Sequence, residues 1–487
     1  MSARGWLCAM LVAGASQAAF AAGTIGSRPL QDLYYGDVLF HYFQRDEFEA
    51  IGRLLAARQQ GRAAAHADDG ELLLGGMLLA FGQTADAQAI FEKQLRVETR
   101  AEPRNRAWLA LARLQLQRGA ADQALRALGQ IDAALPGDFE ADRQMLTAQA
   151  LIDLQRYDEA ARQLAQWQGA ADWRSYAEFN LGVALLRAGR SSEGREALDR
   201  VGAGKLDSAE QRALRDRANT ALAFAALEAG DHADARRVLQ RVRLEGPSSN
   251  KALLALGWAE SGLGHDRQAL VSWQELAQRD AGDPAVDEAL LAVPYAMQRL
   301  GARQQAAAHC QQAIERFEAE IARVDGVIAG LRRDGLVERL LAGDDPQGLA
   351  ADWRIERLPA SPDSAYLYAL IASEPFEQAL RSYRQVRFLR VKLTEAARDD
   401  DALANDPALP PARVAAFRAR LDEQAAQLQR LDAAGAELQA RYRDFLLQQA
   451  VAQLQQRQQR LRDYQAEAHY TQAQLYDASA GPAETPR

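Results

Sequence analysis

Small residues recur along most of this chain at nearly constant intervals. The steps between them are 37, 37, 36, 34, 41, 34 and 37 residues, and the positions are Ala50, Ala87, Ala124, Ala160, Gly194, Ala235, Ala269 and Ala306. A repeat of this length fits two short helices, and one such pair cannot bury its apolar faces alone. The spacing therefore predicts a stack of similar units. The single 41-residue step predicts a lengthened loop or helix around residues 202–213.

Other positions keep a fixed phase with these small residues. Around Gly194, a second small residue (Gly182) lies twelve residues earlier, a turn glycine (Gly189) five earlier and a larger apolar residue (Leu198) four later. Glycine in the turn allows a left-handed backbone between the two helices. We expect the small residues to mark the crossing of the two helices, with the larger side chain as an apolar plug.

The composition favours helices throughout. Of 487 residues, 48% are hydrophobic and 25% are charged, and only 15 are proline. Ala, Leu, Gln, Arg and Glu recur, and these residues lose little freedom in a helix. Alternating runs of β-branched residues, which would indicate strands, are absent. We therefore predict an all-α fold, too long for one compact core.

The repeat resembles the tetratricopeptide repeat (TPR), a helix–turn–helix unit of about 34 residues. Three units carry its signature best, through Trp108, Leu111, Ala112, Gly119, Ala124, Leu128 and Pro136, then Leu181, Gly182, Leu185, Gly189 and Leu198, then Leu256, Gly257, Gly264, Ala269 and Trp273. The resemblance covers residues 31–318. It implies an α/α superhelix of about eight helix pairs, with degenerate first and eighth units.

The same resemblance implies a concave groove, lined by the first helix of each pair, that binds peptides or partner proteins. Carried onto this chain, the groove residues are Arg106, Leu109, Arg113, Tyr176, Phe179, Asn180, Arg187, Arg217, Phe224, Lys251 and Trp258. Aromatic residues beside Arg and Lys suit an extended segment with acidic groups, since aromatic residues and Arg are favoured at binding hot spots. The family's Lys/Asn clamp for a C-terminal carboxylate is not found here.

Residues 1–21 have the pattern of a secretory signal peptide. Arg4 gives a positive start, residues 6–14 are apolar, and Ala19 and Ala21 are small residues at the cleavage positions. The apolar run is shorter than the ~20 residues that span a bilayer, and bulky residues before Cys8 disfavour a lipoprotein. We predict cleavage near residue 22, a periplasmic location in a Gram-negative bacterium, and no transmembrane segment afterwards.

Residues 33–48 are the most aromatic stretch of the chain. Its aromatic residues include Tyr34, Tyr35, Phe40, Tyr42, Phe43 and Phe48. We predict a first helix that packs densely because no unit precedes it. An exposed aromatic binding face is the alternative.

The remainder of the chain changes character after the array. The second helix of the eighth unit is expected to run on from Gln304 to about Arg333, and glycines and prolines then interrupt the chain from Asp334 to Ser364. For residues 319–372 as a whole we predict an irregular helical connector. For residues 373–478 we predict a coiled-coil region. The polar tail 479–487 is expected to be disordered. The heptad seam of its long helix, from residue 411 onward, comprises Val414, Phe417, Leu421, Leu428, Leu431, Leu438, Tyr442 and Phe445, then, after a change of phase near residue 447, Leu454, Leu461, Ala468 and Leu475.

Residues 373–400 are the nearest candidate to pair with this long helix, folded back on it as an antiparallel hairpin. Because they are much shorter than it, we expect much of the long helix to be left for another partner, such as a second copy of the chain.

No pattern for catalysis, a cofactor or a metal emerges. The pair Gly204–Lys205 resembles the end of a phosphate-binding loop, but the first glycine of such a loop and the Ser or Thr after its lysine are missing. His309 and Cys310 are adjacent, so they point away from each other on a helix, and we expect Cys310 to be buried packing. The net charge of −8 argues against nucleic acid as a partner.

We therefore predict a non-catalytic periplasmic scaffold or adaptor that binds envelope proteins through its groove and its coiled coil. One alternative is an accessory subunit of an export or cell-wall machine, with the coiled coil as a docking arm. The other is an enzyme of glycan or peptidoglycan metabolism whose site lies in the connector.

Overall fold

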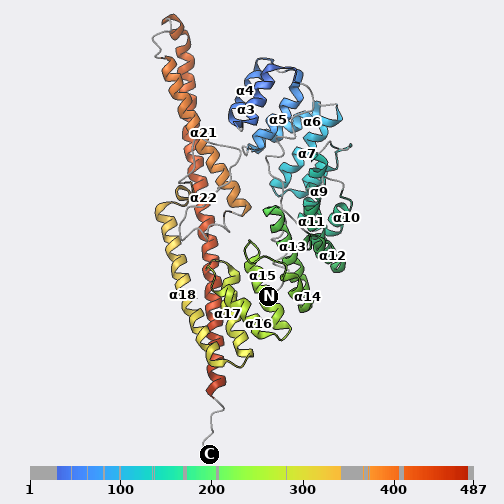
Figure 1. Cartoon of the computed structure of the whole chain (residues 1–487). Helices are drawn as coiled ribbons and strands as arrows, with labels where there is room; N and C mark the ends of the chain where they lie inside the picture. Colours follow the sequence, from blue (N-terminus) through green and yellow to red (C-terminus); the bar gives the residue numbers. More distant parts are fainter. Residues whose placement is uncertain are drawn as a thin grey trace, which may run out of the picture.

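The computed structural model describes residues 30–44, 46–62, 64–80, 83–97, 100–133, 135, 138–167, 173–204, 208–280, 282–341, 366, 371, 373–404 and 411–480. All regular secondary structure in these segments is helical (Figure 1). The predicted all-α fold is confirmed. The predicted signal peptide, most of the connector, Pro136 and residues 481–487 lie outside the described residues.

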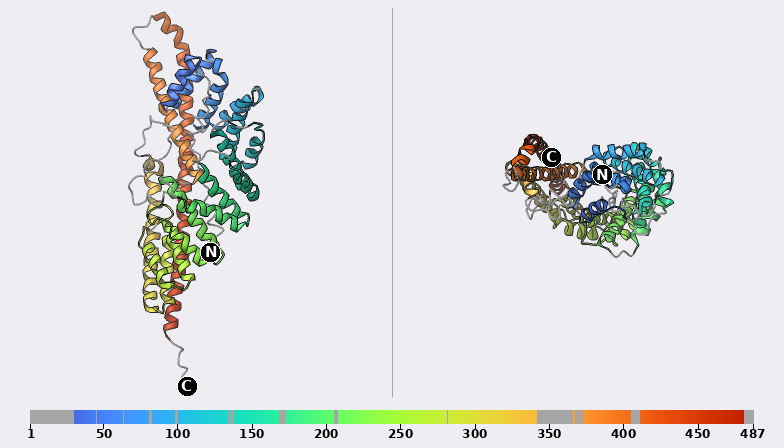
Figure 2. Two further views of the ribbon diagram at one scale, coloured as in Figure 1. Left: turned by 45° about the vertical axis from the view of Figure 1, so that its right-hand side comes forward. Right: turned by 90° about the horizontal axis from the view of Figure 1, so that it is seen from above.

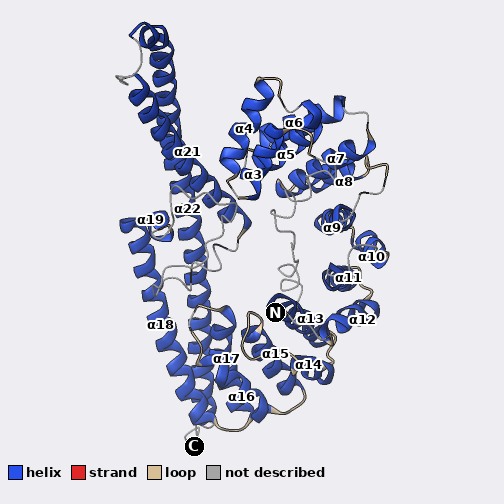
Figure 3. Ribbon diagram, turned by 45° about the horizontal axis from the view of Figure 1, so that its top comes forward, coloured by secondary structure: helices blue, strands red, loops and turns tan. Residues whose placement is uncertain are grey.

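Eight helix pairs follow one another in the described part of the chain. They are α3 (Leu33–Phe43) with α4 (Glu47–Gln59), α5 (Ala67–Ala80) with α6 (Thr84–Val97), α7 (Ala101–Gln117) with α8 (Ala121–Leu128), α9 (Asp138–Asp153) with α10 (Tyr157–Ala165), α11 (Arg174–Arg187) with α12 (Ser191–Gly202), α13 (Ala209–Glu228) with α14 (His232–Leu239), α15 (Ser249–Gly262) with α16 (Asp266–Ala277), and α17 (Pro284–Arg299) with α18 (Arg303–Asp334). Successive pairs stack into a curved array (Figures 2 and 3). The predicted TPR-like solenoid is confirmed.

Three further α-helices and the short 3-10 helix η2 (Ala64–His66) complete the described fold. A short α19 (Leu336–Leu340) follows α18, and α21 (Glu374–Ala404) and α22 (Pro411–Ala480) form a long hairpin beside the array (Figure 1). The extra residues of the 41-residue step are taken up by α13, which has 20 residues and begins with a capping box between Ser208 and Gln211.

The helices of a pair cross where the sequence places its glycines. A Cβ atom on Gly182 would lie 2.5 Å from Cγ of Leu198, and one on Gly75 would lie 2.5 Å from Cε1 of Phe91. Gly257 lies under the ring of Trp273 in the same way. Each large residue therefore fills the space that the missing side chain leaves, as the spacing indicated.

The turn between the helices of a pair needs a left-handed backbone. In five units this residue is a glycine with φ between 70° and 79°, namely Gly119, Gly189, Gly230, Gly264 and Gly301. In the fourth unit the position is held by Gln155, with φ of 59°. A side chain in this conformation costs roughly 1–2 kcal/mol.

Gln155→Gly is therefore expected to raise the free energy of unfolding by about 0.5–1 kcal/mol, because relief of strain outweighs the greater freedom of glycine in the unfolded chain. Urea unfolding measures this change. Gln60→Gly is the matched control, since Gln60 ends α4 with an ordinary φ of −86°. A loss of stability at residue 155 as large as at residue 60 would contradict the strain argument.

The lower half of α22 is covered by the chain itself. Leu454, Leu461, Ala468 and Leu475 are at most 4% exposed, and they belong to the apolar cores that α22 shares with α17 and α18. The expectation that this half is left for another partner is wrong. α18 supplies the partner. It is one helix of 32 residues that continues past the end of the array to Asp334, as the sequence predicted, and its extension packs against α22.

A buried group of charges joins these three helices, and we call it the Arg457 node. The two terminal nitrogens of Arg457 each lie 3.1 Å from a carboxylate oxygen, one on Asp287 of α17 and one on Glu320 of α18. Tyr366 donates its hydroxyl hydrogen to Glu320 at 2.6 Å. Burial raises the pKa of Asp287 to about 6, although Arg457 opposes the shift. Arg457 thus bridges two carboxylates, and Arg323 of α18 lies 3.5 Å from the second carboxylate oxygen of Glu320.

The other arm of the hairpin returns to the beginning of the array. The rings of Phe388 in α21 and Phe48 in α4 make an edge-to-face contact with centroids 5.2 Å apart. The side-chain amides of Gln385 and Gln378 donate to the backbone oxygens of Ala80, at 3.4 Å, and Gln117, at 3.2 Å. The hairpin therefore contacts both the first and the last helix pairs (Figure 3).

Candidate partner-binding surface

Five of the eleven predicted groove residues are buried. Leu109 and Phe179 are 0% exposed and lie in the apolar cores between neighbouring units. Asn180 is 3% exposed. The prediction that these three residues line an open groove is wrong, because their side chains point into the stack and have no surface left for a partner.

Arg106 and Arg113 of α7 are also buried, at 4% and 5% exposure. Arg106 lies 3.7 Å from a carboxylate oxygen of Asp69 in α5, and Arg113 is paired with Asp142 of α9. Burial lowers the pKa of both guanidinium groups, and the neighbouring carboxylates oppose this. These arginines link successive first helices, so assigning them to partner contact is wrong as well.

The other six predicted residues retain accessible surface. Arg217 is exposed, and Tyr176, Arg187, Phe224, Lys251 and Trp258 are half-buried. They come in pairs spaced by seven or eleven residues on α11, α13 and α15, so each pair shares one face of its helix. Because these first helices are packed neighbours, the residues form one region, here called the α11–α15 surface.

Electrostatic contacts connect two of these helices. The hydroxyl of Tyr176 in α11 hydrogen-bonds the carboxylate of Glu210 in α13, and Arg217 of α13 lies near it. Burial, followed by Glu210, raises the pKa of Tyr176, so the phenol stays protonated. The surface therefore carries a neutral phenol, hydrogen-bonded to Glu210, beside the exposed cation Arg217.

The side chain of Trp258 is fixed by contacts within the protein. Its indole nitrogen donates a hydrogen bond to Glu288 at 3.2 Å. Its ring also packs edge-on against Trp273 and at a tilt against Tyr295, with centroids 4.8 Å and 5.7 Å apart. Tyr295 is itself 38% exposed, and the sequence reasoning missed it because it lies beyond the unit that carries the tryptophans.

One side of α3 is exposed and apolar. Leu33, Phe40 and Phe43 are 88%, 59% and 63% exposed, whereas Tyr35 and Val38 on the opposite side are buried. The predicted dense packing therefore holds for one side of the helix only. The other side is exposed and aromatic, as in the alternative given above, and the i, i+7, i+10 spacing of its residues places them on one face.

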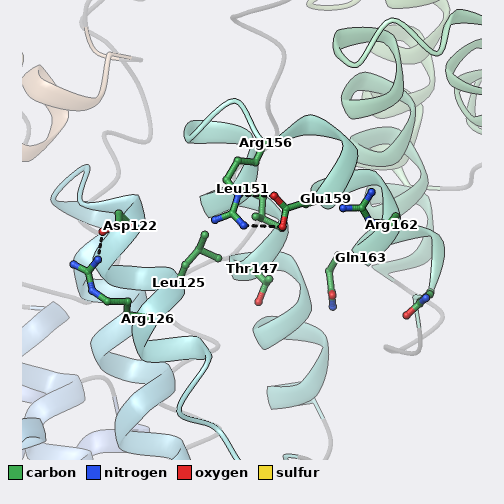
Figure 4. Close-up of a pocket in the computed structure, with 10 residues that line it drawn as sticks. Asp122, Leu125, Arg126, Thr147, Leu151, Arg156, Glu159, Arg162 and Gln163 are labelled. Atoms are coloured by element: carbon green, nitrogen blue, oxygen red, sulfur yellow. Dashed lines mark hydrogen bonds and ion pairs between the residues drawn. The ribbon is translucent and has the colours of Figure 1, made fainter.

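A polar cavity of about 620 Å³ lies between α8, α9 and α10 (Figure 4). It is lined by Asp122, Leu125, Arg126, Thr147, Leu151, Arg156, Glu159, Arg162, Gln163 and Gln166. Arg156 pairs with Glu159 at 2.6 Å, and Arg126 pairs with Asp122. No cysteine, histidine or serine lines it, and these four charges are paired with one another.

The described segments contain no group of three or more His, Cys, Asp or Glu side chains that could hold a metal ion. Within these segments, no helix combines the length and the apolar character needed to cross a bilayer. Cys310 is buried, and burial raises its pKa to about 11. Because the thiolate is the reactive form, Cys310 is suited to packing and not to nucleophilic chemistry.

Comparison with protein-family models and with curated protein sequences returns no match. Among solved structures, the chain is similar to a tetratricopeptide repeat protein from Parabacteroides merdae, with 13% identity, a TM-score of 0.27 and coverage of 58% of this chain and 92% of that one. It is also similar to a chain of the Naa15/Naa10 complex bound to HypK-THB, with 15% identity, a TM-score of 0.35 and coverage of 86% of this chain and 67% of that one. A third similar structure is a chain of the APC/C hetero-tetramer Cut9–Hcn1, with 11% identity, a TM-score of 0.27 and coverage of 84% of this chain and 95% of that one.

Proposed function

We propose that this chain is a non-catalytic scaffold of the periplasm that binds segments of other envelope proteins on the α11–α15 surface. The observation that carries the proposal is the position of Arg217, Tyr176 and Lys251. They lie on three neighbouring first helices, with an exposed or half-buried side chain on each. The periplasmic location rests on the signal-peptide pattern of residues 1–21.

The chemistry of this surface favours an extended segment that carries carboxylates. A guanidinium group can make two parallel hydrogen bonds to one carboxylate. Tyr176 and Phe224 offer aromatic area whose ordering costs little entropy, because each side chain has few rotatable bonds. The hairpin of α21 and α22 extends past the first helix pair (Figure 1), which supports a docking arm and hence an accessory subunit of a larger envelope machine.

Arg187→Glu together with Arg217→Glu is expected to reduce the yield of crosslinked partners at least tenfold at low salt. Charge reversal acts on encounter and selectivity, so the difference from wild type should shrink as salt screens the charges. Crosslinking in periplasmic extract at low and at high salt, followed by purification of the chain, measures this. The N-terminal sequence of that material should begin near residue 22, and a retained Met1 would reject the proposed location.

The matched control reverses two arginines on second helices, Arg126→Glu with Arg237→Glu. Their side chains are 65% and 53% exposed, and each forms an ion pair within its own helix. This variant carries the same change of charge away from the α11–α15 surface, so it should retain its partners. Equal yields from the wild type and both variants would rule out this surface as the binding site.

A further inference from the structure

The two halves of α22 are covered unequally. In the lower half α22 packs against α17 and α18, and Leu461, Ala468 and Leu475 are 1%, 0% and 2% exposed. In the upper half its neighbour is α21 (Figure 1). There Leu431, Leu438 and Phe445 are 56%, 40% and 38% exposed, and we call these three residues the α22 stripe.

The stripe lies beside the face that α21 already covers. Arg390 of α21 binds Asp432 and Gln439 of α22, each at 2.8 Å, and a Cβ on Gly435 would lie 3.0 Å from Cγ of Arg390. Leu431 and Leu438 are neighbours of these residues on the helix, on the side that α21 leaves open. In a sustained heptad pattern both apolar rows are normally covered, so one more helix would complete the packing.

The charges beside the stripe identify that helix. Arg430, Glu437 and Asp444 are all exposed and repeat at seven-residue spacing along one edge of the stripe. If a second α22 lies antiparallel with Leu438 opposite Leu438, then Leu431 meets Phe445 and Arg430 meets Asp444, each twice. At the centre Glu437 faces its own copy, and Arg441 one turn away offsets part of that repulsion. An isologous contact requires this kind of self-complementarity.

We propose that the α22 stripe is the docking site for a second copy of this chain, bound antiparallel with a two-fold axis near Leu438. The contact would combine two α21–α22 hairpins into a four-helix bundle. This inference goes beyond the proposed function and does not depend on it. It makes the scaffold bivalent, with the two α11–α15 surfaces related by the two-fold axis.

Cysteines introduced one at a time into the purified mature protein, in which Cys310 is buried and is replaced by Ala, test the geometry. Under mild oxidation, Leu438→Cys is expected to form a disulfide-linked dimer with itself, because only residues near the axis meet their own copy. Leu431→Cys and Phe445→Cys should each stay monomeric alone and link when mixed one to one. Ala433→Cys, exposed on α22 away from the stripe, is the control and should not link. Self-linking of Leu431→Cys would indicate a parallel contact and overturn the proposal.

Charge swapping tests the edge contacts without any cysteine. Arg430→Asp should weaken dimerisation at least tenfold in sedimentation equilibrium, because it places two acidic residues opposite each other. Arg430→Asp with Asp444→Arg restores opposite charges and should return to the wild-type dissociation constant. The triple variant Leu431→Glu, Leu438→Glu and Phe445→Glu should be a monomer with unchanged helical circular dichroism. A wild-type protein that remains monomeric at 100 μM, on the order of the dissociation constant of a weak specific complex, would overturn the proposal. The same result is expected if a helix of another protein covers the stripe.

Discussion

Arg457→Met is expected to lower the free energy of unfolding by about 3–5 kcal/mol near pH 7.5, because it leaves two buried carboxylates without their shared cation. Asp287 and Glu320 are each 4% exposed, so water cannot replace the guanidinium group. Methionine keeps the volume and the apolar contacts of the side-chain stem, so the loss reports on charge. Urea unfolding followed by circular dichroism measures it.

The size of this loss should depend on pH in a direction fixed by Asp287. Its pKa is about 6 in the folded protein and about 3.9 in an unfolded chain, so the folded state holds the proton more tightly. The stabilising contribution is fully present below about pH 4 and is lost as pH rises through about 6. Arg457→Met should therefore be less damaging at pH 5 than at pH 7.5.

Asn at position 287 provides the control, because it imitates the protonated acid at every pH. In the Asp287→Asn background, Arg457→Met should cost clearly less and should lose most of its dependence on pH between 5 and 7.5. A cost of 1 kcal/mol or less for Arg457→Met alone, about what a surface ion pair contributes, would show that the node is not buried as described.

Gly182→Leu is expected to destabilise the protein by about 1–3 kcal/mol through overpacking of a helix crossing. The first added atom already lies 2.5 Å from Leu198 and 3.1 Å from the backbone oxygen of Gly194. Backbone cannot yield as a flexible side chain can, so α11 and α12 must move apart. Because repeat arrays respond locally, amide hydrogen exchange should increase mainly over residues 141–250 and much less over 411–478.

Gly52→Leu is the matched control for this substitution. Gly52 also lies in a helix, but a Cβ there would meet no atom within 4 Å. It should therefore be neutral or stabilising, since Leu favours helix more than Gly does. A uniform rise in exchange along the whole chain in Gly182→Leu would contradict the modular array.

The crossings were predictable because their determinants are local. Gly182 and Leu198 lie sixteen residues apart within one unit, and their meeting follows from two helices and a turn. Whether a polar side chain on a first helix is buried or exposed was not predictable in the same way. Arg106 and Arg113 occupy the expected helix, but whether they are exposed depends on Asp69 and Asp142, which belong to the preceding and following units. A charged residue on a first helix reads the same in sequence whether it faces solvent or a neighbour's carboxylate.

The heptads of α22 pose the same problem over a longer distance. They showed that the helix needs partners, and this is correct for both halves. They did not show that Leu454 and Leu461 meet α18, because the pattern specifies an apolar row and not the helix that covers it. The length of α18 was the available signal, since a second helix of 32 residues is far longer than its counterparts and must bury its extension somewhere.

The hairpin contacts the array near both of its ends, so array and hairpin together form a closed ring. We call the two places of contact joints. An open stack relaxes at its free ends, so strain in the middle fades over the nearest units. Here the Arg457 node holds one end of the hairpin by charged, buried bonds, and the Phe48–Phe388 contact holds the other by a ring pair next to hydrogen bonds of 3.2 and 3.4 Å. Local loss of packing within one unit, as in Gly182→Leu, leaves both joints in place, whereas a change in the curvature of the whole array changes the distance between them and therefore bears on the hairpin.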